Sequence, residues 1–275
     1  MFDSDEPKIS GKEYHIACGP GDVAHYVILP GDPDRTPKIS SYWDAVTFKA
    51  SHREYVTHTG KYKGKDISCT STGIGGPSLS IAVEELFRIG ARTFIRVGTT
   101  GAIQEQINVG DLIISSGAVR LDGASKAYVR QEYPAFADLE VTFALIEAAE
   151  GLGLPYHVGV TASTDSFYAG QGRPCFNGYD QSWMATLIPD LKKAGVLNFE
   201  MESATLFTLT RLYGGRAGAI TAVIAQRETG QFKADAGLEG AIRVGNEAVR
   251  ILSEWDALKE RKKKKYVYPS LFSQV

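Results

Sequence analysis

The chain has 275 residues, of which 43% are hydrophobic, and 30 Lys and Arg against 32 Asp and Glu give a formal net charge of −2. This composition predicts a folded chain with a substantial core, and it excludes a disordered chain or a small scaffold held by disulfides. The near-neutral charge leaves no basic excess for a general nucleic-acid-binding protein, so any bound anion must be held locally. We expect a single domain over residues 1–275, with a short acidic segment at its start.

Cysteine and histidine are too sparse for a metal or redox site. The three cysteines, Cys18, Cys69 and Cys175, are odd in number and far apart, which excludes a paired disulfide framework and a CxxC motif. The five histidines form no HExxH motif and no zinc ligand set. The N-terminus lacks an apolar signal region, and no run of about 18 apolar residues occurs. We therefore expect a soluble, cytoplasmic protein without a membrane partner or a catalytic metal.

In chain order, short β-rich runs alternate with longer helical patterns. Residues 78–89 show the spacing of one helix face, with Leu79, Ala82, Val83, Leu86 and Phe87 at i, i+3, i+4, i+7 and i+8. Further helices are predicted at 139–149, 202–213 and 238–258, and strands at 26–29, 67–71, 93–97, 111–115, 157–162, 196–201 and 217–225. This alternation predicts an α/β fold in which a mixed central sheet is flanked by helices.

The end of the chain departs from this pattern, and we expect a basic tail from about residue 259. Five basic residues, Arg261 to Lys265, are followed by YVYPSLFSQV. Such a run can be a nucleic-acid or targeting patch, or a solvated helix end whose cations complement the negative end of the helix dipole. Its position and the near-neutral total charge favour the helix end, so we expect no nucleic-acid partner.

Three glycine-containing segments, PGDPDR (30–35), TGIGGPS (72–78) and RVGTTGA (96–102), follow predicted strands. Turns at these places would gather at the carboxyl edge of the sheet, where open α/β sheets bind ligands and where glycine lets backbone N–H groups approach a phosphate. One such turn alone is more often only a turn. None matches GxGxxG or the P-loop pattern, so dinucleotide and P-loop functions lack their parts.

Arg96 interrupts the apolar run 93–97 directly before one of these glycine segments. A guanidinium in such a run needs an anion, which can be a ligand or an internal Asp or Glu. Thr99 and Thr100 follow and can complete an anion pocket, while Arg35 and Arg53 are further candidates for phosphate contacts.

Eight segments, PGDPDR, SHREY, STGIGGPS, RVGTTGAI, RLDGAS, GVTASTDSFY, GQGR and NFEMESAT, together resemble the uridine phosphorylases of the nucleoside phosphorylase superfamily. The resemblance extends from about residue 15 to about residue 252. It implies a pentosyltransferase of pyrimidine salvage that moves the (deoxy)ribosyl group of uridine or deoxyuridine from uracil to inorganic phosphate. It also implies no organic cofactor and a homo-oligomer, a hexamer built as a trimer of dimers.

The same resemblance implies a role for particular residues. The phosphate subsite would comprise Gly31, Arg35, Arg96 and Thr99, with Arg53 supplied by the neighbouring subunit. The ribose subsite would comprise Met201, Glu202 and, from across the dimer, His15; the base subsite would comprise Thr100, Gly101, Phe167, Gln171, Arg173 and Arg227. Arg96, Glu202, Arg173 and Gln171 would carry the catalysis. Glu54, Ile74 and Ser78 match positions that hold potassium at the subunit interface of bacterial relatives, although Glu54 could equally pair with Arg53.

The base subsite bears on the choice of substrate. Gln171 can donate to one uracil carbonyl and accept from N3–H, and Arg173 can neutralise charge on another carbonyl; without the resemblance, GQGR is more readily a polar surface turn. Purine-specific relatives commonly carry an aspartate where this chain has Gln226 and Arg227, and a guanidinium cannot replace that acid. Pyrimidines are therefore favoured.

The nearby Glu228 keeps open a phosphorylase or nucleosidase of purine or broad specificity. A third alternative is a nucleotide-responsive binding module that kept the pocket and lost turnover. Residues 229–237 are expected to form a lid over the base, or else an ordinary surface loop.

Overall fold

The computed structural model describes residues 4–274, so the first three residues of the acidic start lie outside it. Its strands are β1 (Lys8–Ile9), β2 (Lys12–Glu13), β3 (Tyr26–Leu29), β4 (Ala45–His52), β5 (Tyr55–Tyr62), β6 (Lys65–Thr70), β7 (Thr93–Ala102), β8 (Leu112–Leu121), β9 (Ala135–Phe136), β10 (Tyr156–Thr164), β11 (Val196–Glu200), β12 (Arg216–Gln226) and β13 (Gln231–Phe232). The α-helices are α1 (Arg35–Ser40), α2 (Gly76–Arg88), α3 (Ala124–Tyr128), α4 (Leu139–Gly151), α5 (Ser182–Lys193), α6 (Ser203–Leu212) and α7 (Leu238–Lys262). Short 3-10 helices are η1 (Ala169–Gln171), η2 (Phe176–Gly178) and η3 (Pro269–Gln274).

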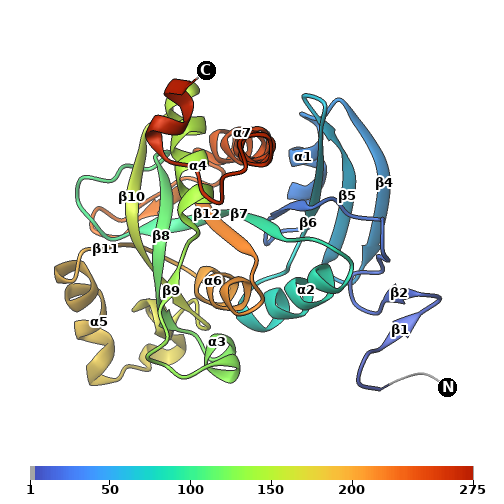
Figure 1. Ribbon diagram of the computed structural model, residues 1–275. Helices are drawn as coiled ribbons and strands as arrows, with labels where there is room; N and C mark the ends of the chain where they lie inside the picture. Colours follow the sequence, from blue (N-terminus) through green and yellow to red (C-terminus); the bar gives the residue numbers. More distant parts are fainter. Residues whose placement is uncertain (1–3, 275) are drawn as a thin grey trace.

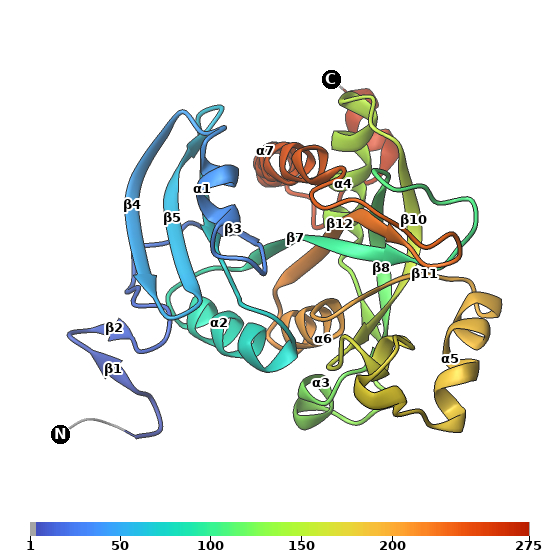
Figure 2. The same ribbon diagram turned by 180° about the vertical axis from the view of Figure 1, so that it is seen from behind.

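Eleven strands form one mixed sheet in the order β13-β12-β8-β10-β11-β7-β3-β6-β5-β4, with β9 paired to β8. Because β12 also pairs with β7, the strands β12, β8, β10, β11 and β7 close into a ring, and the sheet continues from β7 through β3 to the edge strand β4. Helices α4 and α7 lie on one side of the β7 to β12 region and α2 and α6 on the other (Figures 1 and 2). The predicted α/β fold with a mixed central sheet flanked by helices is confirmed.

Strand alternation divides the core into two main clusters. Ile28 of β3 packs in the cluster of α4 and α7, whereas Val27 and Leu29 pack in the cluster of α2 and α6. In β7, Ile95 joins the first cluster and Phe94 the second. Since side chains alternate along a strand, Arg96 lies on the same side as Phe94, toward the start of α6.

The prediction that a glycine turn follows residue 97 is wrong, because β7 continues through Gly98 to Ala102. These residues remain paired with β12, for example Gly98 with Thr221, so glycine does not interrupt the strand. At Gly98 the missing side chain makes room instead: an added Cβ would lie 2.9 Å from Nη2 of Arg96. The glycine thus lets the arginine fold back over its own strand.

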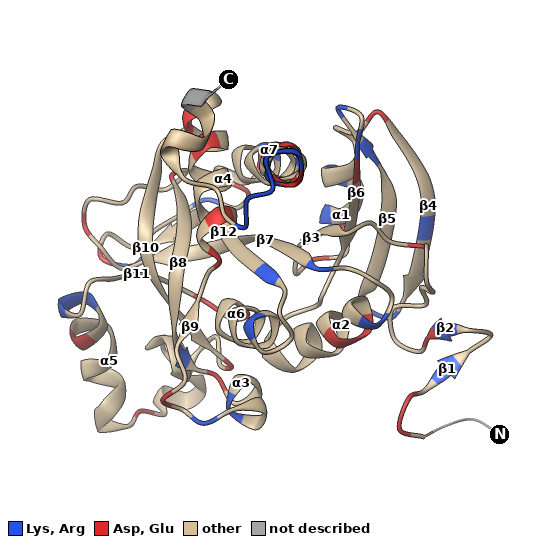
Figure 3. Cartoon of the chain, viewed as in Figure 1, with Lys and Arg blue, Asp and Glu red and all other residues tan. Residues whose placement is uncertain are grey.

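Helix α7 ends at Lys262, four residues beyond the predicted end at 258, so the basic run begins inside its last turn (Figure 3). The segment after it, which sequence reasoning left without an account, folds back on the helices. Leu271 is fully buried, the rings of Trp255 and Phe272 are 5.7 Å apart, and the backbone N–H of Val267 donates to Glu140 at 2.8 Å. Within residues 4–274, no helix is both long and apolar enough to cross a membrane.

Candidate active site

A cavity of about 430 Å³ opens where β7 changes its neighbour. Residues 93–96 of β7 pair with β3, whereas Gly101 and Ala102 pair with β11. Between these ladders the edge of β7 is free. Because β3 runs parallel and β11 antiparallel to β7, their carboxyl ends face each other across this gap. Such a switch point in strand order is where open α/β sheets bind ligands.

Most of the predicted site residues line this one cavity. From the phosphate and ribose sets, the lining includes Gly31, Arg35, Arg96, Thr99, Met201 and Glu202; from the base set it includes Thr100, Gly101, Phe167, Gln171 and Arg173. The fold therefore brings segments from β3, β7, η1 and β11 to a common pocket, in the grouping that the resemblance implied.

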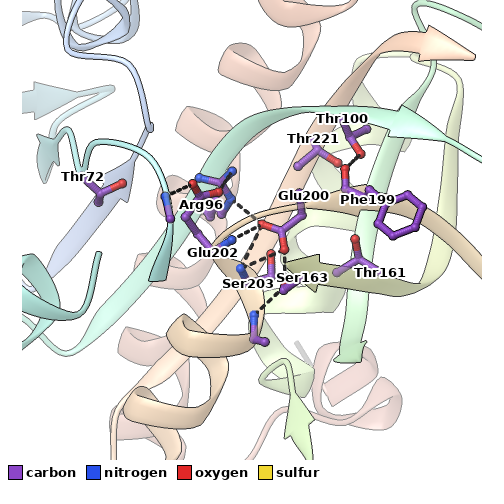
Figure 4. A network of polar contacts seen from close by, with 12 residues as sticks. Thr72, Arg96, Thr100, Thr161, Ser163, Phe199, Glu200, Glu202, Ser203 and Thr221 are labelled. Atoms are coloured by element: carbon purple, nitrogen blue, oxygen red, sulfur yellow. Dashed lines mark hydrogen bonds and ion pairs between the residues drawn. The ribbon is translucent and has the colours of Figure 1, made fainter. Parts of the chain in front are cut away.

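Arg96 lines the pocket and lies between two carboxylates (Figure 4). Its Nε donates to Glu200 at 3.0 Å and its Nη2 forms an ion pair with Glu202. The third nitrogen, Nη1, is buried and has no hydrogen-bond partner among the described residues. A Cβ added to Gly31 would lie 4.0 Å from this Nη1, so the open nitrogen faces the loop after β3. The arginine thus has internal partners and keeps one donor for a ligand.

Arg35 supplies a second open guanidinium nitrogen to the same end of the pocket. Its Nε is buried without a hydrogen bond to any residue in the described part of the chain, and Asp32 approaches it only to 3.8 Å. Burial lowers the pKa of Arg35, and the neighbouring charge of Arg96 lowers it further. Two like charges held together in a buried site favour the binding of an anion between them.

Glu202 closes the pocket from the start of α6. It is 3% exposed and accepts a hydrogen bond from the backbone N–H of Gly75 at 2.6 Å, in addition to its ion pair with Arg96. Burial raises the pKa of Glu202. The backbone N–H of Met201 is a third partner, and the carboxylate still retains a lone pair that can accept a hydrogen bond from a sugar hydroxyl.

At the other end of the pocket, an aromatic ring, an amide and a guanidinium come together. The Arg173 guanidinium lies 4.2 Å from the centre of the Phe167 ring, and its buried Nε has no partner among residues 4–274. Burial lowers the pKa of Arg173. Gln171 is 3% exposed, and its side-chain amide makes no hydrogen bond to the described residues. Polar groups buried in this way need a partner, which a planar base with an imide edge would provide.

Arg227 is not among the residues that line the pocket. Its guanidinium donates to the carbonyl oxygens of Gln171 at 2.9 Å and Gly172 at 3.3 Å. Burial lowers the pKa of Arg227, and the charge of Arg173 adds to this effect. In the structure Arg227 therefore holds the turn that carries Gln171, and a contact with the base stays a prediction.

His15 and Arg53 also lie outside the pocket of their own chain. His15 Nδ1 is 2.6 Å from Glu85, and Arg53 lies beside the ring of Tyr14, with Nη2 3.4 Å from its hydroxyl. Arg53 has a positive φ of 54° and its guanidinium is exposed. Both residues thus lie near Tyr14, and neither lines the pocket of its own chain.

The three positions matched to a potassium site lie together beside the pocket. Ser78 Oγ donates to the carboxylate of Glu54 at 2.9 Å, and Ile74 is exposed in the loop before α2. The pKa of Glu54 is lowered by hydrogen bonds from the backbone N–H of Glu54 itself and from the Ser78 hydroxyl. Glu54 forms no ion pair with another described residue. In residues 4–274, no cluster of three His, Cys, Asp or Glu side chains could hold a metal ion.

Two residues that bear on purine chemistry are held away from the pocket. Gln226 Nε2 donates to the carbonyl oxygens of Gln104 and Ile107, and Glu228 lies 3.3 Å from Lys192. Neither residue belongs to the pocket lining. The segment 229–237 continues from β12 into the hairpin strand β13, whose Phe232 is 69% exposed and lies at the pocket.

Eight residues of the lining were not among the predicted site residues, and these are Asp32, Pro33, Gly73, Phe199, Glu200, Ile224, Ala225 and Phe232. The most consequential is Glu200, the hydrogen-bond partner of Arg96. The segment NFEMES carried a signal for Glu200. It has two carboxylates two residues apart at the end of a strand, and a buried arginine needs such partners. Phe232 lies in the segment 229–237, for which a lid was expected, but no single residue of that segment was named as a site residue.

The chain is similar to known proteins over most of its length. The family model described as "Phosphorylase superfamily" matches residues 25–254, and the chain belongs to that superfamily. Among its relatives, a uridine phosphorylase of Thermococcus kodakarensis is 64% identical over 261 residues, which cover 95% of this chain and 94% of that protein. A uridine phosphorylase of Escherichia coli is 48% identical over 217 residues, covering 78% and 86%. A guanosine phosphorylase of Halorubrum lacusprofundi is 39% identical over 252 residues, covering 88% and 99%.

Proposed function

We infer that this protein is a uridine phosphorylase, which converts uridine and phosphate reversibly to uracil and ribose 1-phosphate in pyrimidine salvage. The observation that carries this inference is the pairing of chemistries in one pocket. Unpartnered nitrogens of Arg35 and Arg96 stand at one end, and the free amide of Gln171 stands with Arg173 at the other. Both groups occur in a chain that is similar to uridine phosphorylases over most of its length.

In the proposed reaction, phosphate lies against Arg96 Nη1 and Arg35, with the backbone of Gly31 and the Thr99 hydroxyl as further donors. A phosphate oxygen forms a bond to C1′ of the ribose as the bond from C1′ to N1 of uracil breaks, and the electron pair of that bond passes to the base. Holding the nucleophile beside the sugar makes the attack effectively unimolecular. Glu202 accepts hydrogen bonds from ribose hydroxyls, and Met201 packs on the sugar.

Uracil leaves with negative charge, which the base subsite can stabilise. The pocket places Gln171 and Arg173 beside the Phe167 ring, so an amide can pair with the imide edge while a guanidinium faces a carbonyl oxygen. Donors aimed at the charge that develops in the transition state are the largest electrostatic contribution in many enzymes.

A purine substrate is the second candidate, since one relative is a guanosine phosphorylase. A purine leaves best when an acid protonates its ring nitrogen. The nearest candidate, Glu228, is paired with Lys192 outside the pocket lining, and Arg227 cannot donate its proton at neutral pH. These contacts favour pyrimidines.

The deciding experiment incubates the protein with uridine, deoxyuridine, thymidine or inosine, each with and without phosphate, and separates the products. We expect uracil and ribose 1-phosphate from uridine only when phosphate is present. Release of uracil without phosphate would identify a nucleosidase, and faster turnover of inosine would assign purine specificity. Tight uridine binding without product would indicate a binding protein.

We also propose a homo-oligomer, a hexamer built as a trimer of dimers, in which Arg53 and His15 complete the pocket of a neighbouring subunit. The support is that both are held outside their own pocket, and that the exposed Arg53 guanidinium contacts only the Tyr14 side chain at short range within residues 4–274. Arg35→Ala and Arg53→Ala should each be nearly inactive alone. Co-assembled subunits of the two variants should regain activity, because one pocket of each mixed dimer then keeps both arginines. No regain would refute sharing of the site.

Potassium between subunits is a further proposal. A carboxylate, a hydroxyl and a backbone carbonyl from Glu54, Ser78 and Ile74 are the oxygen ligands that a hard cation prefers. The cation would brace the loop before α2, from which Gly75 contacts Glu202. We expect a higher melting temperature in potassium chloride than in tetramethylammonium chloride, and no such difference in Glu54→Gln.

A further inference from the structure

One carboxylate in the pocket lining has no part in the reaction described above. Glu200, the last residue of β11, is 3% exposed. Its carboxylate accepts hydrogen bonds from Arg96 Nε at 3.0 Å, from the backbone N–H groups of Glu202 and Ser203 at 2.9 Å each, and from the Ser163 hydroxyl. Figure 4 shows these contacts converging on the one side chain.

We propose that Glu200 is a positioning residue, which fixes the Arg96 guanidinium so that Nη1 faces the phosphate subsite. A guanidinium is planar, and its donors form a rigid fork. With Nε held by Glu200 and Nη2 by Glu202, the plane and the rotation of the group are both set, so Nη1 has one remaining direction. The inference rests on the proposed phosphate subsite and deepens it.

The two carboxylates on Arg96 differ in their freedom. Four groups occupy the lone pairs of Glu200, and they come from three elements, β7, β10 and the start of α6. Ser163 adds rigidity because its hydroxyl also accepts a hydrogen bond from the N–H of Ala204 at 2.9 Å. Glu202 accepts from Gly75, from Arg96 and from its neighbour Met201, and it lines the pocket where the sugar would lie. Glu200 therefore serves as the fixed anchor of the arginine, and Glu202 as the ligand-facing partner.

Without the anchor, Arg96 would keep its positive charge near the site but lose its orientation. A displaced donor weakens the binding of the anion that it should meet, whereas contacts of the base at the far end of the pocket remain. The effect should thus fall on phosphate rather than on uridine. If Glu200 had a purely structural role, its loss would instead weaken the binding of both substrates, because the fold would be less stable.

The test compares Glu200→Gln with the wild type in two measurements, steady-state kinetics with both substrates varied and calorimetric binding of inorganic phosphate without nucleoside. The Gln amide keeps the shape of the Glu side chain, but its NH₂ group would face donors where the carboxylate oxygen accepted hydrogen bonds. Loss of a charge-assisted hydrogen bond predicts a rise of about 10- to 100-fold in the KM for phosphate and in its dissociation constant. The KM for uridine should change by less than about threefold.

Ser163→Ala provides a milder second variant, which also decides the question if Glu200→Gln does not fold. It should raise the phosphate KM by about three- to tenfold, the cost of one hydrogen bond. Its matched control is Thr161→Val, two residues earlier on β10, which removes a buried hydroxyl whose hydrogen bond goes to the carbonyl of Asn198 at 3.4 Å. This control should leave phosphate binding unchanged.

Unchanged phosphate affinity in Glu200→Gln, or equal losses for phosphate and uridine that follow the melting temperature, would overturn the positioning role. The positioning role would also be overturned if Thr161→Val weakened phosphate binding as much as Ser163→Ala does. A wild-type protein that binds phosphate but does not cleave uridine would refute the proposed function alone, because the binding measurement still tests Glu200. A wild-type protein that does not bind phosphate would refute both.

Discussion

The assignment of the base subsite predicts a selective loss in Gln171→Ala. The Gln171 amide is buried, lines the pocket and has no partner among the described residues, so in the complex its carbonyl and NH₂ group would both bind uracil. Truncation leaves one donor and one acceptor of the base unpaired beside a position that is only 3% exposed. At 1 to 2 kcal/mol for each group, the loss is about 2 to 4 kcal/mol, or roughly 30- to 1000-fold in kcat/KM for uridine.

The assay follows phosphorolysis of uridine and inosine by product separation at saturating phosphate. Inosine, whose base lacks the uracil imide edge, should lose less than about tenfold. Gln181→Ala serves as the control, since Gln181 is an exposed glutamine outside the pocket lining, at the start of α5, and should retain wild-type kinetics. Equal losses for uridine and inosine in Gln171→Ala would refute the pairing of this amide with the pyrimidine edge.

Two further predictions concern stability. Burial would raise the pKa of Asp256, but ion pairing with Arg216 and hydrogen bonds outweigh it and lower this pKa to about 2. The ionised Asp256 therefore stabilises the fold above the unfolded pKa near 3.8, and this stabilisation is lost as the pH falls through about 2. Asp256→Asn should therefore lower the free energy of unfolding at pH 7, measured in urea, by about 1 to 2 kcal/mol, a range that allows for partial exposure. The difference in this free energy between the variant and the wild type should narrow below about pH 4. A difference that stays constant with pH would contradict the ion pair as its source. Leu271 is fully buried in the segment after α7, so Leu271→Ala should lower the free energy of unfolding, measured by urea titration, by about 2 to 4 kcal/mol. The activity assay should show an unchanged kcat. An unchanged free energy of unfolding would show that this segment does not pack as described.

Much of the fold was predictable because its elements carry periodic apolar patterns. Strand β3 and helices α4 and α6 agree with the predicted ranges to within about two residues. Strands β4 and β5 were missed, since the alternation of β4 between exposed and half-buried positions gives little apolar contrast. The strand through Gly98 was missed for a different reason, because the partner strands β12 and β11 override the tendency of glycine to interrupt a strand.

The site was predictable as a set of residues but not as a set of contacts. The resemblance carries residue types at matching positions, and most of those positions line the pocket. It could not show that the Arg227 guanidinium turns toward the backbone of the GQGR segment, nor that Glu200 shares Arg96 with Glu202. Such contacts depend on the direction of side chains across strands far apart in the sequence, which no local pattern encodes.

A comparison of two charged clusters shows why the pocket is interpreted as functional. At the amino ends of β3 and β12, Arg216 binds Glu140 at 2.9 Å and Asp256, Lys259 lies 2.9 Å from Asp256, and the Tyr26 hydroxyl donates to Asp256 at 2.6 Å. None of these side chains is left with a buried unpartnered atom in the described structure.

At the carboxyl edge, by contrast, Arg35, Arg96 and Arg173 each keep one buried nitrogen without a partner in the described chain. An unpaired buried donor costs roughly 1 to 3 kcal/mol, and more where the group is charged. Among the buried arginine nitrogens of the described chain, the three without a partner all belong to residues that line the pocket, which is what donors reserved for ligands would show. The nitrogens of the neighbouring Arg35 and Arg96 fit an anion, and that of Arg173, near the Phe167 ring, fits the electron-rich edge of a departing base.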